Sequence, residues 1–198
     1  MKMPVTPTRL ELELPAYEQS KLLQLQQVFA ALCNEVSAVA QREGCWGRVR
    51  LHHLVYSDLR AAHPHVGAQH ICNAVYAVSK AFRVLLSRSN LTTESPGRHS
   101  SRTKVIPMIH FVETNPVYFD RKSMSAGPDS LSILGVGGRI KIPMAIPTGF
   151  LNTFQHEGIK EITLIKYPKG SFFIEIWTNG DVQRPAMVDG HQLEKAKT

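Results

Sequence analysis

One short strand pattern stands apart from all the other strand patterns in this sequence. Between Thr8 and Leu14 the residues TRLELEL place leucine and glutamate at alternating positions, which is typical of a strand with one buried face. Pro15 ends this pattern, and no second strand pattern follows for about ninety residues. Because a lone strand is not stable in water, we expect it to pair with strands much later in the chain.

Helical periodicity fills the interval after this strand. Apolar residues recur at three- and four-residue spacings in three segments, which predict helices over 17–42, 51–62 and 66–88. Gly44 and Gly47 mark the first break, and His63-Pro64-His65 marks the second. Residues 89–103 are polar and contain Pro96-Gly97, so they read as a loop.

The rest of the sequence is typical of β structure. Short apolar or alternating runs predict strands over 105–111, 117–119, 131–134, 139–142, 159–167 and 171–178. The predicted fold is therefore α+β. In it the first strand joins the later strands, and the helices form an insertion into a small barrel or sheet.

Positive charge is concentrated in one part of the chain. The 198 residues carry 23 lysines and arginines against 16 acidic residues, a net charge of +7. The segment from Lys80 to Lys122 holds eight basic and three acidic residues, so it contributes five of those seven charges. A stretch of one sign that spans a helix end and a loop favours a surface that contacts phosphates. A basic patch that serves only solubility remains the alternative.

The motifs of the common enzyme classes are missing from the sequence. It has no phosphate-binding loop, no dinucleotide fingerprint and no nucleophile elbow, and its carboxylates are too scattered for a metal-dependent nuclease. The histidines lack the spacing of zinc ligands, and the three cysteines form no close pair. We therefore expect no catalytic residue, no metal and no cofactor.

The apolar runs are too short to cross a membrane, and the first residues lack the apolar core of a secretory signal. We therefore expect a cytoplasmic protein without a membrane partner.

Two stretches together carry a resemblance to a known family. The helical block runs AYEQSKLLQLQQVF to SKAFRVLLSRS, and the later strands include VYFDRKSMS, GRIKIP and GIKEITLIKYPKGSFFIEIW. In order and spacing these stretches resemble the N-terminal half of the TnpB (OrfB) family of transposon-encoded RNA-guided nucleases and the related type V CRISPR effectors. The resemblance covers about residues 8–178. The matching positions are Tyr17-Glu18-Gln19, Ala68-Gln69, Ala81-Phe82, Asp120 to Ser125, Gly138 to Pro143 and Gly158 to Trp177.

The resemblance implies a division of the chain into regions. Residues 1–15 and 104–184 would form a wedge, a small oligonucleotide-binding-like β-barrel, and residues 16–92 an inserted helical recognition lobe. Residues 93–103 would be a flexible basic loop, and residues 185–198 a loose tail. The family's RuvC nuclease domain, with its catalytic aspartate, does not follow Trp177 here, and the family's zinc-ribbon cysteine pairs are absent.

The resemblance therefore implies a nuclease-free, RNA-guided DNA-binding module rather than an enzyme, with a structured guide RNA and target DNA as its partners. Base pairing would read the sequence, and the protein would read backbone shape. The expected phosphate contacts are Lys80, Arg83, Arg88, Arg98, Arg102, Lys104, Arg121, Lys122, Arg139 and Lys141. The candidate base contacts are Gln69, Asn73, Tyr76 and Ser79. The aromatic rings of Tyr76, Phe82 and Tyr118 are candidates for stacking on bases, although their spacing is more typical of core residues.

Two other functions remain open from the sequence. The chain could be a subunit of a split or multi-protein effector that needs a separate nuclease or another partner protein. It could also be a generic basic barrel protein that binds no guide RNA. Co-purification of a protein partner would indicate the first, and the recovery of no RNA would indicate the second.

Overall fold

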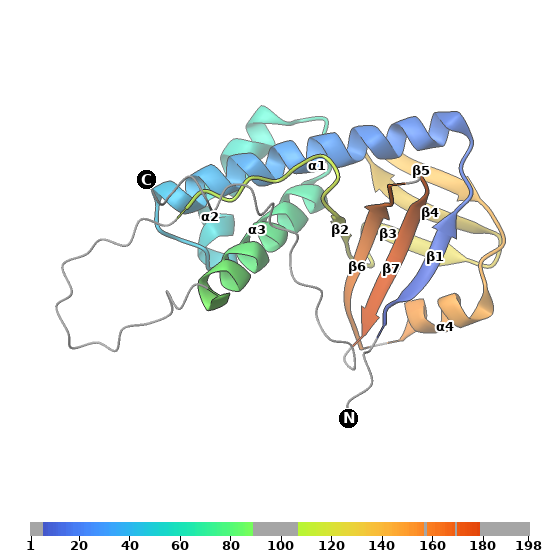
Figure 1. Ribbon diagram of the computed structural model, residues 1–198. Helices are drawn as coiled ribbons and strands as arrows, with labels where there is room; N and C mark the ends of the chain where they lie inside the picture. The colour runs from blue at the N-terminus through green and yellow to red at the C-terminus, as the bar shows by residue number, and fades with distance from the viewer. Residues whose placement is uncertain (1–5, 89–106, 157, 169, 179–198) are drawn as a thin grey trace, which may run out of the picture.

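The computed structural model describes residues 6–88, 107–156, 158–168 and 170–178, and its fold is α+β (Figure 1). The elements are, in chain order, β1 (Thr8–Leu12), α1 (Ala16–Arg42), α2 (Arg48–Ala62), α3 (Ala68–Arg88), β2 (Val117–Phe119), β3 (Met124–Gly127), β4 (Ser130–Gly135), β5 (Gly138–Pro143), α4 (Thr148–Gln155), β6 (Ile159–Lys166) and β7 (Phe172–Thr178). The three predicted helices are confirmed. So is the expected separation of the first strand from the others by a helical block.

The first strand pairs with the last one. β1 runs antiparallel to β7, with Leu10 opposite Ile174, and the order of the four-stranded sheet is β1-β7-β6-β2. The leucines of β1 face the core, as their alternation predicts. Pairing of the N-terminal strand with strands more than 150 residues away is therefore confirmed.

The remaining strands form a second sheet. β3, β4 and β5 make an antiparallel three-stranded sheet, in which Leu131 and Ile133 of β4 point inward and its serines point outward. The β4–β5 turn uses Gly137 at φ +75, a conformation that favours glycine. The expected oligonucleotide-binding-like barrel is not confirmed, because the described strands form two sheets and no closed barrel. In each sheet the two outer strands keep one edge without a strand partner among the residues described.

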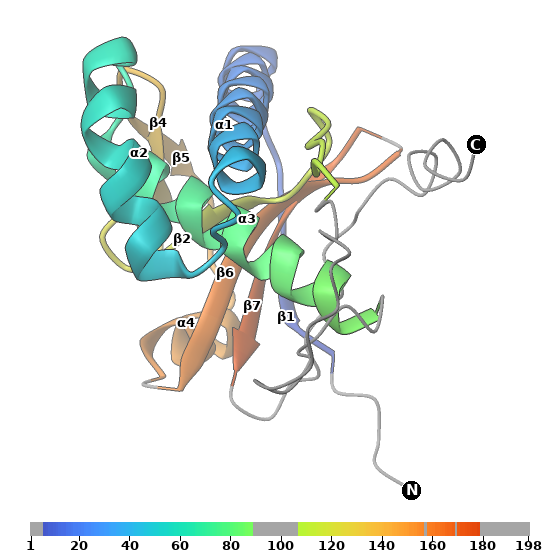
Figure 2. The ribbon, with the colours of Figure 1, turned by 90° about the vertical axis from the view of Figure 1, so that its left-hand side faces the viewer.

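The helices and both sheets share one hydrophobic core. Figures 1 and 2 show α1, α2 and α3 gathered beside the sheets, and α1 contacts strands of both. Phe82 of α3, Leu22 of α1 and Ile162 of β6 are all almost completely buried in this core. Within the parts of the chain described, no helix is both long enough and apolar enough to cross a lipid bilayer.

The segment before β2 differs from its prediction. The described part of the expected strand 105–111 is not a strand, because side chains of α1 take the hydrogen bonds that a neighbouring strand would make. Asn34 accepts from the Phe111 amide at 2.7 Å and donates to its carbonyl at 2.9 Å. Ser37 donates to the Ile109 carbonyl at 2.6 Å and accepts from its amide at 3.2 Å. The segment is thus fixed against a helix rather than in a sheet.

Candidate nucleic-acid interface

Five of the singled-out residues recur along one face of α3. Gln69, Asn73, Tyr76, Lys80 and Arg83 follow three- and four-residue spacings, so they form a single stripe. Gln69 Nε2 donates to Asp120 Oδ2 at 2.5 Å, and Asn73 Nδ2 donates to the Tyr118 carbonyl at 2.9 Å. These two amides therefore hold α3 against β2 and the turn that follows it.

The middle of the stripe contains a buried ion pair. Lys80 Nζ lies 2.8 Å and 2.6 Å from the two carboxylate oxygens of Glu161 in β6, and their side chains are 6% and 9% exposed. The Tyr76 hydroxyl donates to the same carboxylate at 3.0 Å. Burial, with Glu161 beside it, raises the pKa of Tyr76 to about 12, so this hydroxyl keeps its proton at neutral pH.

These contacts correct part of the expected interface. Lys80, Asn73 and Ser79 are buried, so a nucleic acid cannot reach them in this structure. Phe82 and Tyr118 are core residues rather than free stacking platforms, as their spacing suggested. The physical reason is that the stripe packs onto β2 and β6, which the helical periodicity alone does not reveal.

Arg83 is the exposed cation of the stripe. It lies at the rim of a pocket of about 290 Å³ that Tyr76, Lys80 and Ser87 also line. Arg83 Nε donates to the Ser79 carbonyl at 3.3 Å, and the residue is exposed.

Arg48 joins this region from α2 and was missed by the sequence analysis. Its guanidinium carbon lies 5.1 Å from the centre of the Tyr76 ring, within cation–π range. Both Arg48 and Arg83 act on the Tyr76 hydroxyl by lowering its pKa, against the larger effect of burial. A signal was present in the sequence: Arg48 and Arg50 occupy the first turn of α2, where a helix favours acidic residues.

A second basic surface lies on the outer face of the three-stranded sheet. Ser125 of β3, Ser132 of β4 and Lys141 of β5 are in register across the three strands. Arg139 lies two residues before Lys141, on the same face of β5, and both side chains are exposed. The Arg139 guanidinium donates to the Ser132 and Ser125 hydroxyls at 2.8 and 3.3 Å, which holds it flat against the sheet. This face therefore presents hydroxyls and cations.

The β2–β3 turn carries two exposed cations beside this surface, Arg121 and Lys122. Asp120 Oδ1 accepts hydrogen bonds from the amides of Lys122 and Ser123 at 3.0 and 2.9 Å, so the turn is rigid. Arg121 donates to the carbonyls of Gln155 and His156, where α4 ends. Arg139 also donates to the Lys122 carbonyl at 3.2 Å, which ties the turn to β5.

The two basic surfaces meet beside Cys72 of α3. Burial raises the pKa of the Cys72 thiol, and Asp120 also raises it, while Arg48 and Lys122 lower it. Charges from α2 and from the β2–β3 turn therefore lie around the same point of α3.

Five exposed cations thus follow one another over α2, α3 and the second sheet. We call this set the basic track: Arg83, Arg48, Lys122, Arg139 and Lys141.

Some of the expected contacts fall outside this description. Arg98, Arg102 and Lys104 lie outside the described residues, and Arg88 is the last residue of α3. In the described part of the chain, no three histidine, cysteine or acidic side chains come together in a way that could hold a metal ion. The candidate interface thus consists of the basic track with its neighbouring hydroxyls.

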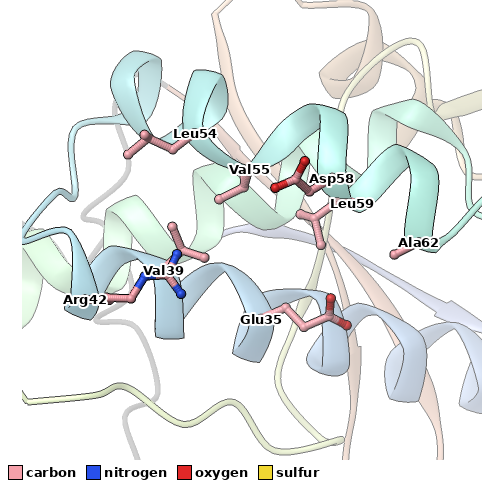
Figure 3. Close-up of a pocket in the computed structure, with 8 residues that line it drawn as sticks. All are labelled: Glu35, Val39, Arg42, Leu54, Val55, Asp58, Leu59 and Ala62. Carbon is pink, nitrogen blue, oxygen red and sulfur yellow. The ribbon is translucent and has the colours of Figure 1, made fainter.

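A second pocket, between α1 and α2, has a different character. Figure 3 shows Val39 and Val55 on its walls, with the carboxylates of Glu35 and Asp58 and the guanidinium of Arg42 around them. Both carboxylates would repel phosphates, so this pocket does not extend the basic track.

No protein-family model matches the chain, and no curated protein matches its sequence.

Proposed function

We propose that the chain is a nucleic-acid-binding module that holds a structured guide RNA and helps to recognise target DNA, without nuclease chemistry of its own. The observation that carries the proposal is the basic track. Its cations are exposed, and two of them lie beside serine hydroxyls that are themselves suited to bind phosphate oxygens.

The dimensions of the basic track suit a nucleic-acid strand better than a small anion. Cys72 and Arg83 are eleven residues apart on α3, which corresponds to about 16 Å along the helix axis. A duplex has one phosphate on each strand for about every 3.4 Å of its axis, so this part of the track alone, lying along such an axis, spans roughly five phosphates of one strand. A single small anion would contact only one or two of its cations.

The proposal includes the finer architecture that the family resemblance implies. In it, the strands act as the wedge that binds the RNA scaffold, and α1 to α3 act as the recognition lobe beside the guide and target strands. The insertion of these helices between β1 and the strands that follow is consistent with that arrangement, as is the pairing of β1 with β7.

The first experiment is to purify the full chain from its host and sequence the nucleic acid that accompanies it. We expect one structured RNA species that ends in a variable guide. Duplex DNA should then bind only when it matches that guide. If no RNA accompanies the protein, the guide-RNA function is wrong.

A second experiment tests the surface itself. The variant Lys122→Glu/Lys141→Glu reverses two exposed charges of the basic track and should lower RNA affinity by about tenfold or more. The control variant Lys21→Glu/Lys160→Glu carries the same change of net charge on α1 and β6, neither of which contributes a cation to the track, and should bind almost normally. Equal losses in both variants would mean that only net charge matters.

A further inference from the structure

The groove between α1 and α2 leaves apolar side chains in water. Leu54 of α2 lines this groove and is 40% exposed, and Val49 at the start of the same helix is 72% exposed. Val39 of α1 lines the groove opposite Leu54 (Figure 3). Exposed apolar side chains next to a hollow with charged edges are typical of a protein–protein contact.

The charges around this groove are arranged by sign. Glu35 and Asp58 lie toward the end of the groove formed by the C-terminal part of α2, and Arg42 lies toward the N-terminal part of α2 (Figure 3). Arg50 lies one helical turn before Leu54, so it belongs to the basic end as well. Arg42 is itself paired with Glu43 at 2.9 Å, so the net positive charge at this end comes from Arg50. The groove thus has an acidic end, an apolar middle and a basic end.

Such a groove is complementary to a copy of itself turned by 180°. Arg50, Leu54 and Asp58 are spaced by four residues, so they form one stripe with Leu54 at its centre. When two α2 helices pack antiparallel about a two-fold axis at Leu54, each Arg50 faces Asp58 of the second copy. In the same register Gly47 faces Ala61, and both are small enough to let the helices approach closely.

The key charges are available for this contact. Arg50 and Asp58 are both exposed, and neither forms an ion pair with another described residue. Glu35 is held beside His63 at 2.9 Å, where it adds to the acidic end.

We propose that α2 is a homodimer interface, in which the α1–α2 groove receives α2 of a second copy in antiparallel orientation. The mixed signs favour a second copy over a nucleic acid, because a nucleic acid would meet Glu35 and Asp58. The contact leaves the basic track free, since Arg48 lies over Tyr76 on the α3 side of α2. The dimer does not depend on the proposed function, and it would present two basic tracks at once.

The experiment is a charge-exchange test on the full chain, read by sedimentation velocity over a range of protein concentrations at low salt. Wild-type protein should show a concentration-dependent monomer–dimer equilibrium. Arg50→Glu alone and Asp58→Arg alone should each be monomeric, because each places like charges opposite one another. Because both positions are exposed, neither variant should disturb folding, which circular dichroism checks.

An equimolar mixture of the two single variants provides the decisive measurement. In the mixed dimer, the glutamate introduced at position 50 of one chain faces the arginine introduced at position 58 of the other. The second pair is native, so dimerisation should return. The double variant Arg50→Glu/Asp58→Arg should also dimerise, and the control Lys160→Glu should behave as wild type.

Three outcomes would overturn the proposal. The first is a wild-type protein that stays monomeric at every concentration. The second is a mixture of the two single variants that does not restore the dimer. The third is a dimer that the single variants leave intact.

Discussion

Lys80 of α3 and Glu161 of β6 form a buried ion pair, in which the ammonium lies 2.8 Å and 2.6 Å from the two carboxylate oxygens. The pair joins the helical block to the four-stranded sheet across 81 positions of sequence. Lys80 Nζ also lies 5.3 Å from the centre of the Tyr118 ring. A lysine that composition assigns to a nucleic-acid surface is therefore part of the core.

Removing one member of this pair should destabilise the fold strongly. Glu161→Gln leaves the Lys80 charge buried without its counter-charge, so we expect a loss of about 3 kcal/mol in the free energy of unfolding by urea. The double variant Lys80→Met/Glu161→Gln should recover most of that loss, because no uncompensated charge remains. If the double variant is as unstable as the single one, the pair is not the source of the effect.

Asn34 and Ser37 should contribute more stability than other polar residues of α1. Replacing either residue with alanine leaves the backbone of Phe111 or Ile109 without its partner, and each loss should cost about 1–3 kcal/mol. Hydrogen exchange at the amides of residues 109 and 111 should accelerate in these variants. The exposed Ser20 bonds only to its own helix turn, so Ser20→Ala should leave both the exchange and the stability nearly unchanged.

His70 should make the fold sensitive to mild acid. Burial lowers the pKa of His70 below its usual 6.5. The nearby backbone of Leu134 and Gly135 and the charge of Asp120 raise this pKa, but the effect of burial is larger. As the pH falls below 6.5, the unfolded chain binds a proton that folded His70 does not. The free energy of unfolding should therefore not depend on this residue's protonation above pH 6.5. Below pH 6.5 it should fall by up to about 1.4 kcal/mol per pH unit.

Urea unfolding between pH 7.5 and 5.5 measures this slope. In the variant His70→Gln the slope should become shallower, because the buried group no longer titrates. The exposed His53 offers a matched control, and His53→Gln should keep the wild-type slope. Parallel curves for wild type and His70→Gln would show that another group is responsible.

RNA binding through the basic track should weaken steeply with salt. If the five cations each contact a phosphate, the logarithm of the affinity should fall with the logarithm of salt concentration with a slope of about −3.5 to −4.5. Arg83→Gln should reduce the size of this slope by nearly one, while Lys160→Gln should not change it. A slope near zero would mean that phosphate contacts do not drive binding.

Local pattern was enough to place most of the elements. The alternation in β1 and the apolar spacing of α1, α2 and α3 predicted these elements within a few residues, because one-sided burial leaves its period in the sequence. β3 and α4 were missed. β3 is only four residues long and its burial does not alternate cleanly, and α4 is an eight-residue helix after Pro147, too short for its Phe150 and Phe154 to show a period.

The sequence by itself determined that a lone strand had to pair with distant strands, and that positive charge gathers between Lys80 and Lys122. Only the tertiary structure decided which of those charges face water. Lys80 is neutralised by Glu161, whereas Arg48, from outside that segment, joins the basic track. The physical reason is that the period of apolar residues shows that one face of a helix is buried. The residues that pack on this face come from distant parts of the chain, and the period does not show which they are.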